Sequence, residues 1–342
     1  MNKEGNIPFG LGAIKGMGKN AARQIITERE KNGSFRDIYD FVERIDLFAV
    51  NKKNLEALAM AGAFDNFTDI KRGQFFSLDN KGISFIENLL RFGNKIKNEK
   101  NTTQKSLFGD IQGFEIVKPE IPQVTDWSKL EKLNMEKEVI GIFLSAHPLD
   151  DFKLEIDKFC NTTLAQLNNP DSLKGKELTV AGIVTDVKKG TTRKGNPYGV
   201  LTIQDYSDTY RLAMFNTDYI NYSKYFATGY FLLIKGKVQP KYYNNDELEF
   251  KVKKIHLLPD VKEELINTVS LEMPVSEITP EFIDDFDRIT KENNGKTTVK
   301  FSIYDNEGKY NIEMFSRTRR IYLSDNFINF LEKNNNIGFK LN

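Results

Sequence analysis

The 342 residues are enough for several compact domains, and their 49 basic and 48 acidic side chains nearly cancel. The chain is therefore not basic throughout, so any surface that binds nucleic acid must be local. One cysteine excludes an intramolecular disulfide, and two histidines argue against a histidine-rich metal centre. Because there is neither a signal pattern nor an apolar run of membrane-spanning length, we expect a cytoplasmic protein without membrane contact.

A glycine-rich turn comes before the first helical pattern, which covers residues 21–29. Glycines let the backbone turn tightly and approach a partner, and the free amides that open the next helix attract phosphate. The segment resembles a helix-hairpin-helix motif, which holds duplex DNA through its backbone without reading sequence. The candidate contacts are Lys15, Gly16, Met17, Gly18 and Lys19. The alternative is a helix cap whose glycines serve packing.

Further helices are predicted over residues 35–45, 52–61 and 82–92, each with apolar residues at helical spacing. We interpret these apolar stripes as core. Residues 1–92 are therefore expected to form one helical DNA-binding region.

Residues 93–126 are predicted to be a linker. Its first part, 93–103, is rich in Asn, Lys and Thr and has no periodicity, which predicts an extended or mobile backbone. Gln104, Leu107 and Phe108 follow, in a short peptide spanning 104–108. Two adjacent large apolar side chains in such a segment either fold back on this chain or fill a pocket on another protein.

A helical bridge is predicted over 127–174, and five strand-like runs follow within 175–259. A short helical patch separates the third run from the fourth. This order is typical of a five-stranded OB-fold barrel.

Two loops of this barrel combine cations with aromatic rings. Their candidate residues are Lys188, Lys189, Arg193, Lys194, Tyr198, Lys241, Tyr242 and Tyr243. Such loops suit single-stranded DNA, because the charges follow the phosphates and the rings stack on bases. The alternative is a barrel whose basic loop only keeps it soluble and whose rings fill its own core.

Residues 264–342 predict a small α+β domain with the order strand, helix, strand, strand, strand, helix, its last three strands covering 297–304, 309–315 and 320–323. Asp285 and Asp287 have the Asp-x-Asp spacing of two-metal polymerases. We interpret them instead as the solvated side of an amphipathic helix. The predicted fold class is multidomain α+β: a helical helix-hairpin-helix domain, a five-stranded OB-fold barrel and this C-terminal domain.

Several longer motifs follow one another in order, namely residues 10–18, 34–41, 50–58, 61–65 and 138–149. Together they resemble the late part of the bacterial replicative DNA polymerase III alpha subunit. In that family this region holds a tandem helix-hairpin-helix element, a Gln-x-x-hydrophobic-Phe peptide, an OB-fold and a terminal domain. The resemblance implies DNA replication as the process, with duplex and single-stranded DNA as ligands. It also implies that Gln104, Leu107 and Phe108 bind the sliding clamp, and that the C-terminal domain contacts the clamp-loader tau subunit.

The resemblance further implies that the family's polymerase active site, with its Mg²⁺-binding carboxylates, precedes the matched region. We therefore expect no catalytic residue, metal or cofactor in this chain, which would be a nucleoid-associated C-terminal fragment of a DNA-directed DNA polymerase. The alternative is a stand-alone DNA-binding adaptor with helix-hairpin-helix and OB modules. A nuclease or other enzyme ranks third, since no cluster of acids, His or Cys supports one.

Overall fold

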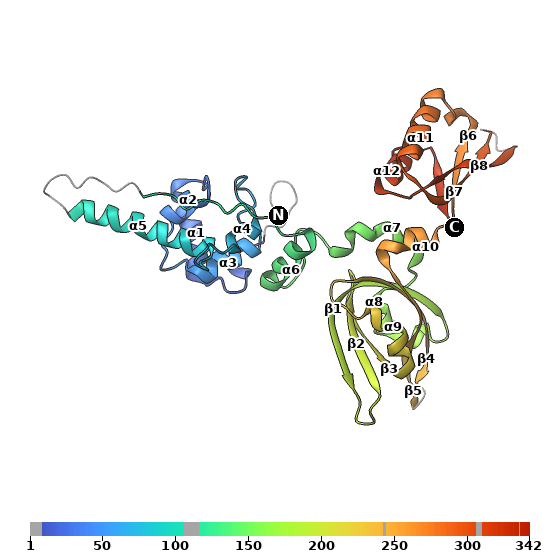
Figure 1. The fold of residues 1–342 in the computed structure, drawn as a ribbon, viewed down its shortest axis with the longest axis horizontal. Coiled ribbons are helices and arrows are strands. Elements are labelled where there is room, and N and C mark those ends of the chain that lie inside the picture. Colours follow the sequence, from blue (N-terminus) through green and yellow to red (C-terminus); the bar gives the residue numbers. More distant parts are fainter. Residues whose placement is uncertain (1–8, 106–115, 242–243, 306–309, 335) are drawn as a thin grey trace. The chain divides into compact units, whose positions relative to one another are not determined.

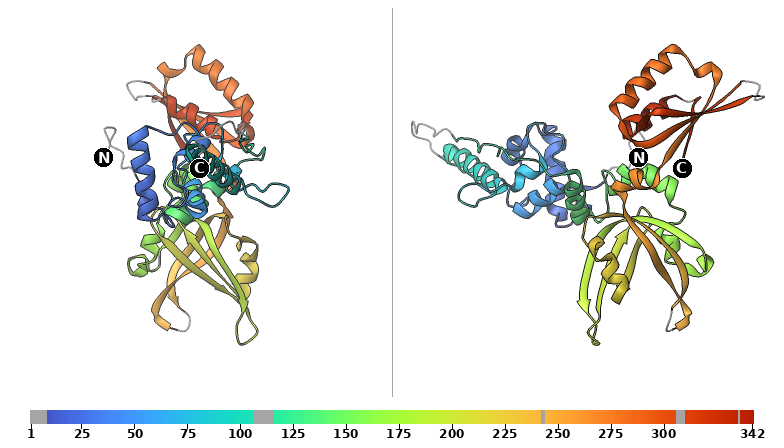
Figure 2. Two further views of the ribbon diagram at one scale, coloured as in Figure 1. Left: turned by 90° about the vertical axis from the view of Figure 1, so that its left-hand side faces the viewer. Right: turned by 45° about the vertical axis from the view of Figure 1, so that its right-hand side comes forward.

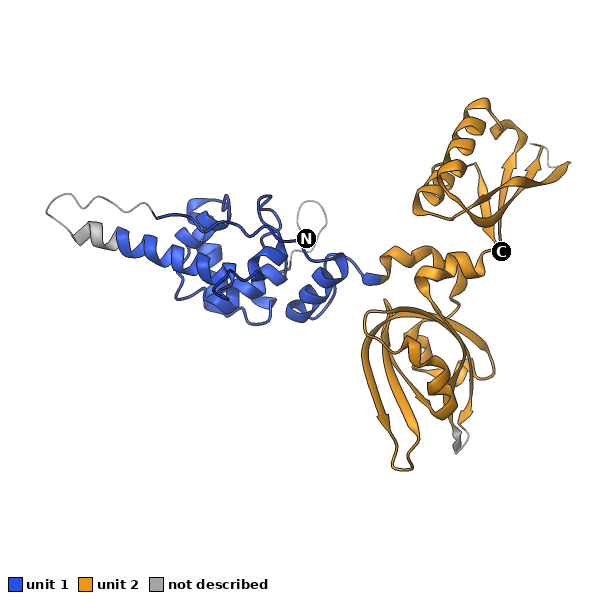
Figure 3. Ribbon diagram, viewed as in Figure 1, with its two compact units in different colours: residues 1–148 blue, residues 149–342 orange. Residues whose placement is uncertain are grey.

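The computed structural model describes residues 9–105, 116–241, 244–305, 310–334 and 336–342, with the backbone alone over 100–105 and 244–246. The chain divides into two compact units, Met1–Pro148 and Leu149–Asn342 (Figure 3). The first unit is built of helices, and the second holds two sheets. The division falls inside the segment 127–174 that was predicted to be a helical bridge.

The first unit packs its helices around one apolar cluster (Figure 1). Its elements are η1 (Leu11–Ala13), α1 (Lys19–Asn32), α2 (Ile38–Arg44), α3 (Lys52–Met60), α4 (Arg72–Phe76), α5 (Phe85–Lys105) and α6 (Lys129–Ile140). Three helices begin at side chains that accept a hydrogen bond from a first-turn amide: Asp37, Asn51 and Ser128. These capping residues fix where α2 and α3 begin, and apolar residues at helical spacing give each helix a face that packs in the core.

Helix α5 overturns the prediction of an extended segment over 93–103, because it runs without interruption to Lys105. The predicted helix ended at residue 92, whereas Gly93 is a packing residue inside α5. A Cβ at this position would stand 2.8 Å from both the Val42 carbonyl oxygen and Leu47 Cδ1. The Lys97 ammonium donates to the Ile45 carbonyl one turn later. Contacts with α2 and the loop after it thus carry the helix through a polar sequence that has little periodicity of its own.

In the second unit, short helical segments surround a five-stranded sheet (Figures 1 and 2). The helical segments before and within it are η2 (Pro148–Phe152), α7 (Lys153–Phe159), α8 (Leu164–Leu167), η3 (Pro170–Leu173), α9 (Asn216–Tyr222) and η4 (Ser223–Tyr225). The strands are β1 (Glu177–Thr191), β2 (Pro197–Gln204), β3 (Thr209–Phe215), β4 (Phe231–Lys241) and β5 (Asn244–Leu257). Their order across the sheet is β3-β2-β1-β4-β5, with every neighbouring pair antiparallel.

This sheet confirms the predicted OB-fold, including the helix between the third and fourth strands. Alternate residues of β2 and β3, such as Leu201, Ile203 and Leu212, are buried in one apolar cluster. The residues between them therefore face away from that cluster. The outward face of β2 and β3 is the one that OB-folds use for ligands.

The C-terminal part forms a second sheet of order β8-β7-β6-β9, joined to the first by η5 (Leu258–Asp260) and α10 (Val261–Leu265). Its elements are β6 (Thr268–Pro274), η6 (Val275–Glu277), α11 (Pro280–Glu292), β7 (Asn294–Tyr304), β8 (Asn311–Ile321), α12 (Asp325–Lys333) and β9 (Gly338–Leu341). β6 and β7 are parallel, so α11 is the crossover between them.

Two strand predictions for this domain were wrong. Residues 311–315 and 320–321, which were assigned to two strands, belong to one strand, β8 (Asn311–Ile321). Residue 309 lies outside the described residues, and residues 322–323 follow the strand. The structure adds β9 after the last helix, where four residues pair with β6. So short a strand has no periodicity to read, and its pairing partner lies far away in the sequence. The overall class, multidomain α+β, is confirmed.

Asp285 and Asp287 lie on the solvent-exposed side of α11, as predicted. Asp285 pairs with Arg288 at 2.5 Å, and Asp287 pairs with Lys291 and Arg319 at 2.5 and 3.1 Å. These carboxylates are therefore satisfied by cations of their own domain.

Candidate nucleic-acid interface

The predicted hairpin forms a tight turn between η1 and α1. Gly16 adopts φ +87°, a left-handed conformation that glycine tolerates and most side chains do not. Met17 is buried in the core beneath the turn, while Lys15, Gly18 and Lys19 are exposed. Among the five predicted residues, Gly16 thus permits the turn and Met17 anchors it in the core. The two lysines are exposed to solvent.

Two bonds from other helices hold this turn in place. The Lys15 amide donates to the Val139 carbonyl at 2.7 Å, in the last turn of α6. The last carbonyls of a helix have no partner within it, so this bond satisfies both the Val139 carbonyl and the Lys15 amide. The Asn54 side chain in α3 donates to the Gly16 carbonyl at 2.8 Å. The hairpin is therefore fixed by two helices outside its own pair.

The helix that follows the turn opens without a cap. Gly18 is its N-cap residue and has no side chain to accept a hydrogen bond from the first turn. The first amides of a helix lack acceptors within the helix, and the positive end of the helix dipole adds to their attraction for an anion. Lys15 and Lys19 precede and follow Gly18 in the chain, and both are exposed. The arrangement suits one backbone phosphate.

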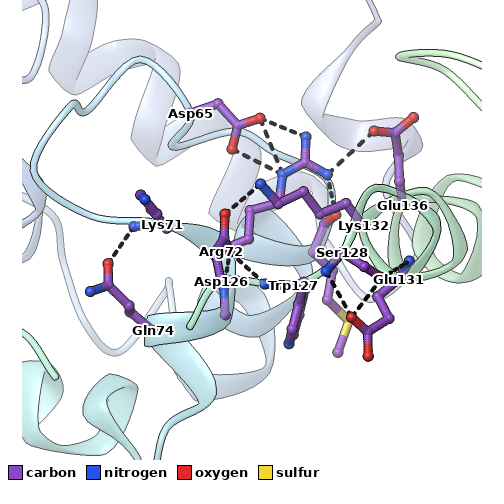
Figure 4. Close-up of polar contacts among 12 residues, drawn as sticks. Asp65, Lys71, Arg72, Gln74, Asp126, Trp127, Ser128, Glu131, Lys132 and Glu136 are labelled. Atoms are coloured by element: carbon purple, nitrogen blue, oxygen red, sulfur yellow. Dashed lines mark hydrogen bonds and ion pairs between the residues drawn. The ribbon is translucent and has the colours of Figure 1, made fainter. Parts of the chain in front are cut away.

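The position of α6 depends on a buried ion pair (Figure 4). Arg72 donates to the Asp65 carboxylate at 2.6 Å, to the Met60 carbonyl at 3.3 Å and to Glu136 at 3.4 Å. Its side chain is 9% exposed and that of Glu136 only 1%. The hydrogen bond with Asp65 contributes most to raising the pKa of the Arg72 guanidinium, while burial opposes it. Arg72 thereby connects α3, α4 and α6.

Residues next to this pair fasten the segment that leads into α6. The Asp126 carboxylate accepts from the Gly73 amide at 3.2 Å and pairs with Lys132. Trp127 stacks on Phe76 with ring centroids 5.0 Å apart. A Cβ on Gly73 would lie 3.2 Å from the Trp127 ring, so glycine permits this close approach. Sequence reasoning missed this network, because its members are far apart along the chain.

In the OB-fold, residues 192–196 close the loop between β1 and β2. The Gly195 amide donates to the Thr192 carbonyl at 2.9 Å, and the Asn196 amide donates to Thr192 Oγ1 at 3.1 Å. Arg193 and Lys194 are exposed at the tip. The turn therefore displays two cations next to the outward face of the sheet.

Below this tip lies an aromatic pair that the sequence predicted only in part. Tyr198 and Phe215 are register partners on β2 and β3, and their rings stack with centroids 5.8 Å apart. Gly190 is the partner of Tyr198 on β1, and a Cβ there would lie 3.0 Å from the tyrosine ring. Gly190, Tyr198 and Phe215 thus form a shelf across three strands. Phe215 is half exposed and was not predicted, because its place beside Tyr198 follows from strand register.

The remaining predicted OB-fold residues are distributed unevenly. Lys188 shares the outward face with Gly190, whereas Lys189 alternates to the other face. Lys241 pairs with Glu247, and this bond raises the pKa of the Lys241 ammonium. Tyr242 and Tyr243 lie outside the described residues.

The predicted clamp-binding peptide is also largely outside the described residues. The backbone of Gln104 belongs to the last turn of α5, while Leu107 and Phe108 are not described.

Neither a metal cluster nor a membrane span occurs in the part of the chain that the structure describes. Its His, Cys, Asp and Glu residues form no group of three that could hold a metal ion. None of its helices combines the length and apolar character needed to cross a bilayer.

Three segments match families of known proteins. Residues 1–75 match the helix-hairpin-helix motif, and residues 178–258 match the OB-fold nucleic acid binding domain. Residues 269–342 match the DNA polymerase III alpha subunit, C-terminal domain. By fold and by these matches, the chain is a modular protein with two kinds of nucleic-acid-binding domain.

Curated relatives named DNA polymerase III subunit alpha match most of the chain. The Vibrio cholerae protein is 28% identical over 306 residues, covering 89% of this chain and 25% of its own length. The Borreliella burgdorferi protein is 29% identical over 273 residues, covering 78% of this chain and 22% of its own length. The chain is thus related to the C-terminal part of DNA polymerase III subunit alpha, which confirms the resemblance inferred from its motifs. It spans about a quarter of the length of these relatives.

Among solved structures, a mitochondrial single-stranded DNA-binding protein from S. cerevisiae aligns at 19% identity with a TM-score of 0.20. The alignment covers 25% of this chain and 95% of that protein.

The buried ion pair yields a stability prediction. Replacing Arg72 by Met would leave the buried Glu136 carboxylate without its cation, so unfolding should cost about 3–5 kcal/mol less. The single tryptophan, Trp127, packs against Gly73, the residue after Arg72, and reports unfolding of the first unit alone. Urea titration followed by Trp127 fluorescence measures the change.

Arg36→Met is the matched control, because its ion pair with Asp40 has an arginine side chain that is 83% exposed. Such a pair contributes about 1 kcal/mol or less. Equal losses in the two variants would contradict the role given to Arg72.

Proposed function

We propose that this chain acts in chromosomal DNA replication as the C-terminal part of a DNA polymerase III alpha subunit. In this role it binds DNA without sequence preference and connects a DNA-directed DNA polymerase to its sliding clamp. The observation that carries the proposal is the first hairpin, an uncapped helix start between Lys15 and Lys19 that two other helices hold in place. The proposal assigns no catalytic residue, metal or cofactor to the chain, and places it in the cytoplasm at the nucleoid.

The first hairpin binds the backbone of duplex DNA. A phosphate at the start of α1 accepts from the first-turn amides, and Lys15 and Lys19 neutralise its charge and that of its neighbour. None of these groups reads a base edge, so the contact positions the chain on any sequence.

The OB-fold binds the single-stranded template. Arg193, Lys194 and Lys188 follow the phosphates, while the shelf of Tyr198 and Phe215 stacks on bases. Phe215 supports this assignment best, since its ring stacks on Tyr198 on one side yet stays half exposed on the face that OB-folds use for ligands.

The peptide after α5 ties the chain to the clamp. Leu107 and Phe108 fill an apolar pocket on the clamp, and Gln104 hydrogen-bonds at its rim. The length and polar character of the preceding helix support this, since α5 continues to Lys105 while Ile96 is the last of its residues in the apolar cluster of the first unit.

The C-terminal domain offers its edge strand β8 to the clamp-loader tau subunit. Exposed apolar side chains run along this strand, including Ile312, Met314 and Phe315, which are 58%, 46% and 61% exposed. In the described sheet β8 pairs only with β7, so its other edge can accept a strand.

Reversing the charges at the first hairpin should weaken duplex binding. Lys15→Glu with Lys19→Glu removes two phosphate contacts, so the slope of log K against log salt should fall by about 2. Fluorescence anisotropy of a labelled duplex across a salt series measures both affinity and slope.

Lys31→Glu with Lys81→Glu is the control, because both lysines are exposed in the same unit and the net charge change is identical. The hairpin assignment fails if the two double variants behave alike.

Removing the exposed ring of the aromatic shelf should weaken single-strand binding. Phe215→Ala loses a stacking contact that contributes about 1–3 kcal/mol per base, which corresponds to about a five- to hundredfold loss of affinity. Titration with an oligothymidine measures this loss, and duplex affinity should stay unchanged. Tyr230→Ala, a ring of similar exposure elsewhere in the second unit, is the control. A normal oligothymidine affinity for Phe215→Ala would rule out the shelf.

Replacing both Leu107 and Phe108 by Ala should abolish clamp binding. Each large apolar side chain contributes about 1.5–3 kcal/mol when buried, so affinity should fall by at least a hundredfold. Calorimetric titration of the sliding clamp measures the loss, while DNA binding stays at the wild-type level. A lowered melting temperature with normal clamp affinity would instead mean that these residues pack on this chain.

A further inference from the structure

The first unit contains a second hairpin, between α2 and α3, built on the same pattern as the first. Ile14 and Leu47 are buried at the same distance before the following helix, and Met17 and Val50 are buried three residues later. Both N-cap residues are extended, Gly18 with ψ 151° and Asn51 with ψ −177°. The two hairpins therefore have equivalent positions along their turns.

Position by position, the second hairpin differs from the first in two ways. Phe48 takes the place of Lys15, directly after the first buried residue. In addition, Asn51 and Asn54 form a reciprocal capping box that occupies amides at the start of α3, whereas α1 is uncapped. The second hairpin therefore lacks the open helix start that suits a phosphate.

Phe48 is held in an outward position by its own turn. Its amide donates to the Asp46 carboxylate at 3.1 Å, and the amides of Ala49 and Val50 donate to the Asp46 carbonyl at 3.1 and 2.9 Å. The phenylalanine is 95% exposed, more than any other large apolar residue in the described part of the chain. The hydrogen-bonded turn thus fixes the backbone from which an almost fully solvated phenyl ring projects, and the ring is available to a partner.

We propose that Phe48 is an apolar contact to duplex DNA. Its ring packs against deoxyribose and base edges in the groove whose phosphates the first hairpin holds. The two hairpins then make different contacts with the DNA. The first binds phosphates through charge and amides, and the second inserts an apolar side chain into the groove. This inference rests on the duplex binding proposed for Lys15 and Lys19.

The surroundings of Phe48 favour DNA over a protein partner. The start of α3 adjoins the first hairpin, since Asn54 donates to the Gly16 carbonyl and the stem of Lys53 would lie 3.4 Å from a Cβ on Gly16. Lys52 forms ion pairs with Glu87 at 3.0 Å and with Glu56 at 3.8 Å. Lys53, by contrast, has no ion partner among the described residues. Lys53 thus adds a cation next to Gly16, in a turn whose neighbours in the chain, Lys15 and Lys19, are exposed, and this local positive charge complements a polyanion.

The test compares salt dependence with affinity. Phe48→Ala should weaken duplex binding about tenfold and leave the slope of log K against log salt unchanged, because an apolar contact releases no counterions. Phe48→Lys, which restores the residue type of the first hairpin, should instead increase that slope by about 0.9. Anisotropy titrations of the full chain with one labelled duplex, from low to moderate salt, give both quantities.

Leu78→Ala is the matched control, since Leu78 is an exposed apolar residue of the same unit at 66%. Wild-type duplex affinity in Phe48→Ala would overturn the inference and assign the ring to another class of partner. If the Lys15 and Lys19 variant also binds duplex normally, the proposed duplex site itself has failed. A Phe48→Ala variant with an altered Trp127 unfolding curve would mean that the ring stabilises the fold.

Discussion

The Glu136 carboxylate is completely buried, and the first unit depends on how its charge is satisfied. It accepts from the Leu144 and Ser145 amides at 2.7 and 2.6 Å, from the Ser145 hydroxyl, and from the Arg72 guanidinium. A buried carboxylate with this many donors is well satisfied, but it is costly if one of them is removed. The network therefore fixes α6 and the segment after it in a single arrangement against α3 and α4.

This arrangement is linked to the candidate nucleic-acid interface by one backbone carbonyl. Val139 lies three residues after Glu136, and its carbonyl takes the Lys15 amide. With the Lys15 amide committed to this bond, the groups left for a phosphate are the first-turn amides of α1 and the two lysine side chains. The ion pair that holds α6 in place is thus connected, through Val139, to the bond that occupies the Lys15 amide. A segment about 120 residues further along the chain therefore helps to position the hairpin.

Local signals made much of the fold predictable. The helices predicted over 35–45 and 52–61 are α2 and α3, and the five strand-like runs predicted within 175–259 are β1 to β5, with the helix between the third and the fourth. Predictions failed where a distant contact overrode the local signal. Glycine disfavours a helix interior, so the sequence predicted that the helix ends before Gly93. The missing Cβ of Gly93 instead lets α5 lie against α2, and that packing extends the helix. β9 is similar, since only pairing with β6 makes a strand of four terminal residues.

The candidate sites divide along the same line. Lys15 to Lys19 could be found from sequence, because glycines, lysines and a helix start are adjacent in the chain. Phe215 and Phe48 could not, since an exposed phenylalanine is indistinguishable from a core phenylalanine by type alone. Register places Phe215 beside Tyr198, and the correspondence of two turns places Phe48 opposite Lys15. Both rings belong to modules that also carry exposed cations, Lys15 and Lys19 in one and Arg193 and Lys194 in the other. Each module therefore combines charge, which acts at a distance, with an apolar surface that acts only on contact. Charge alone would hold DNA but let the protein slide along it. An apolar ring adds binding free energy only where it packs against the DNA, so it favours those bound positions.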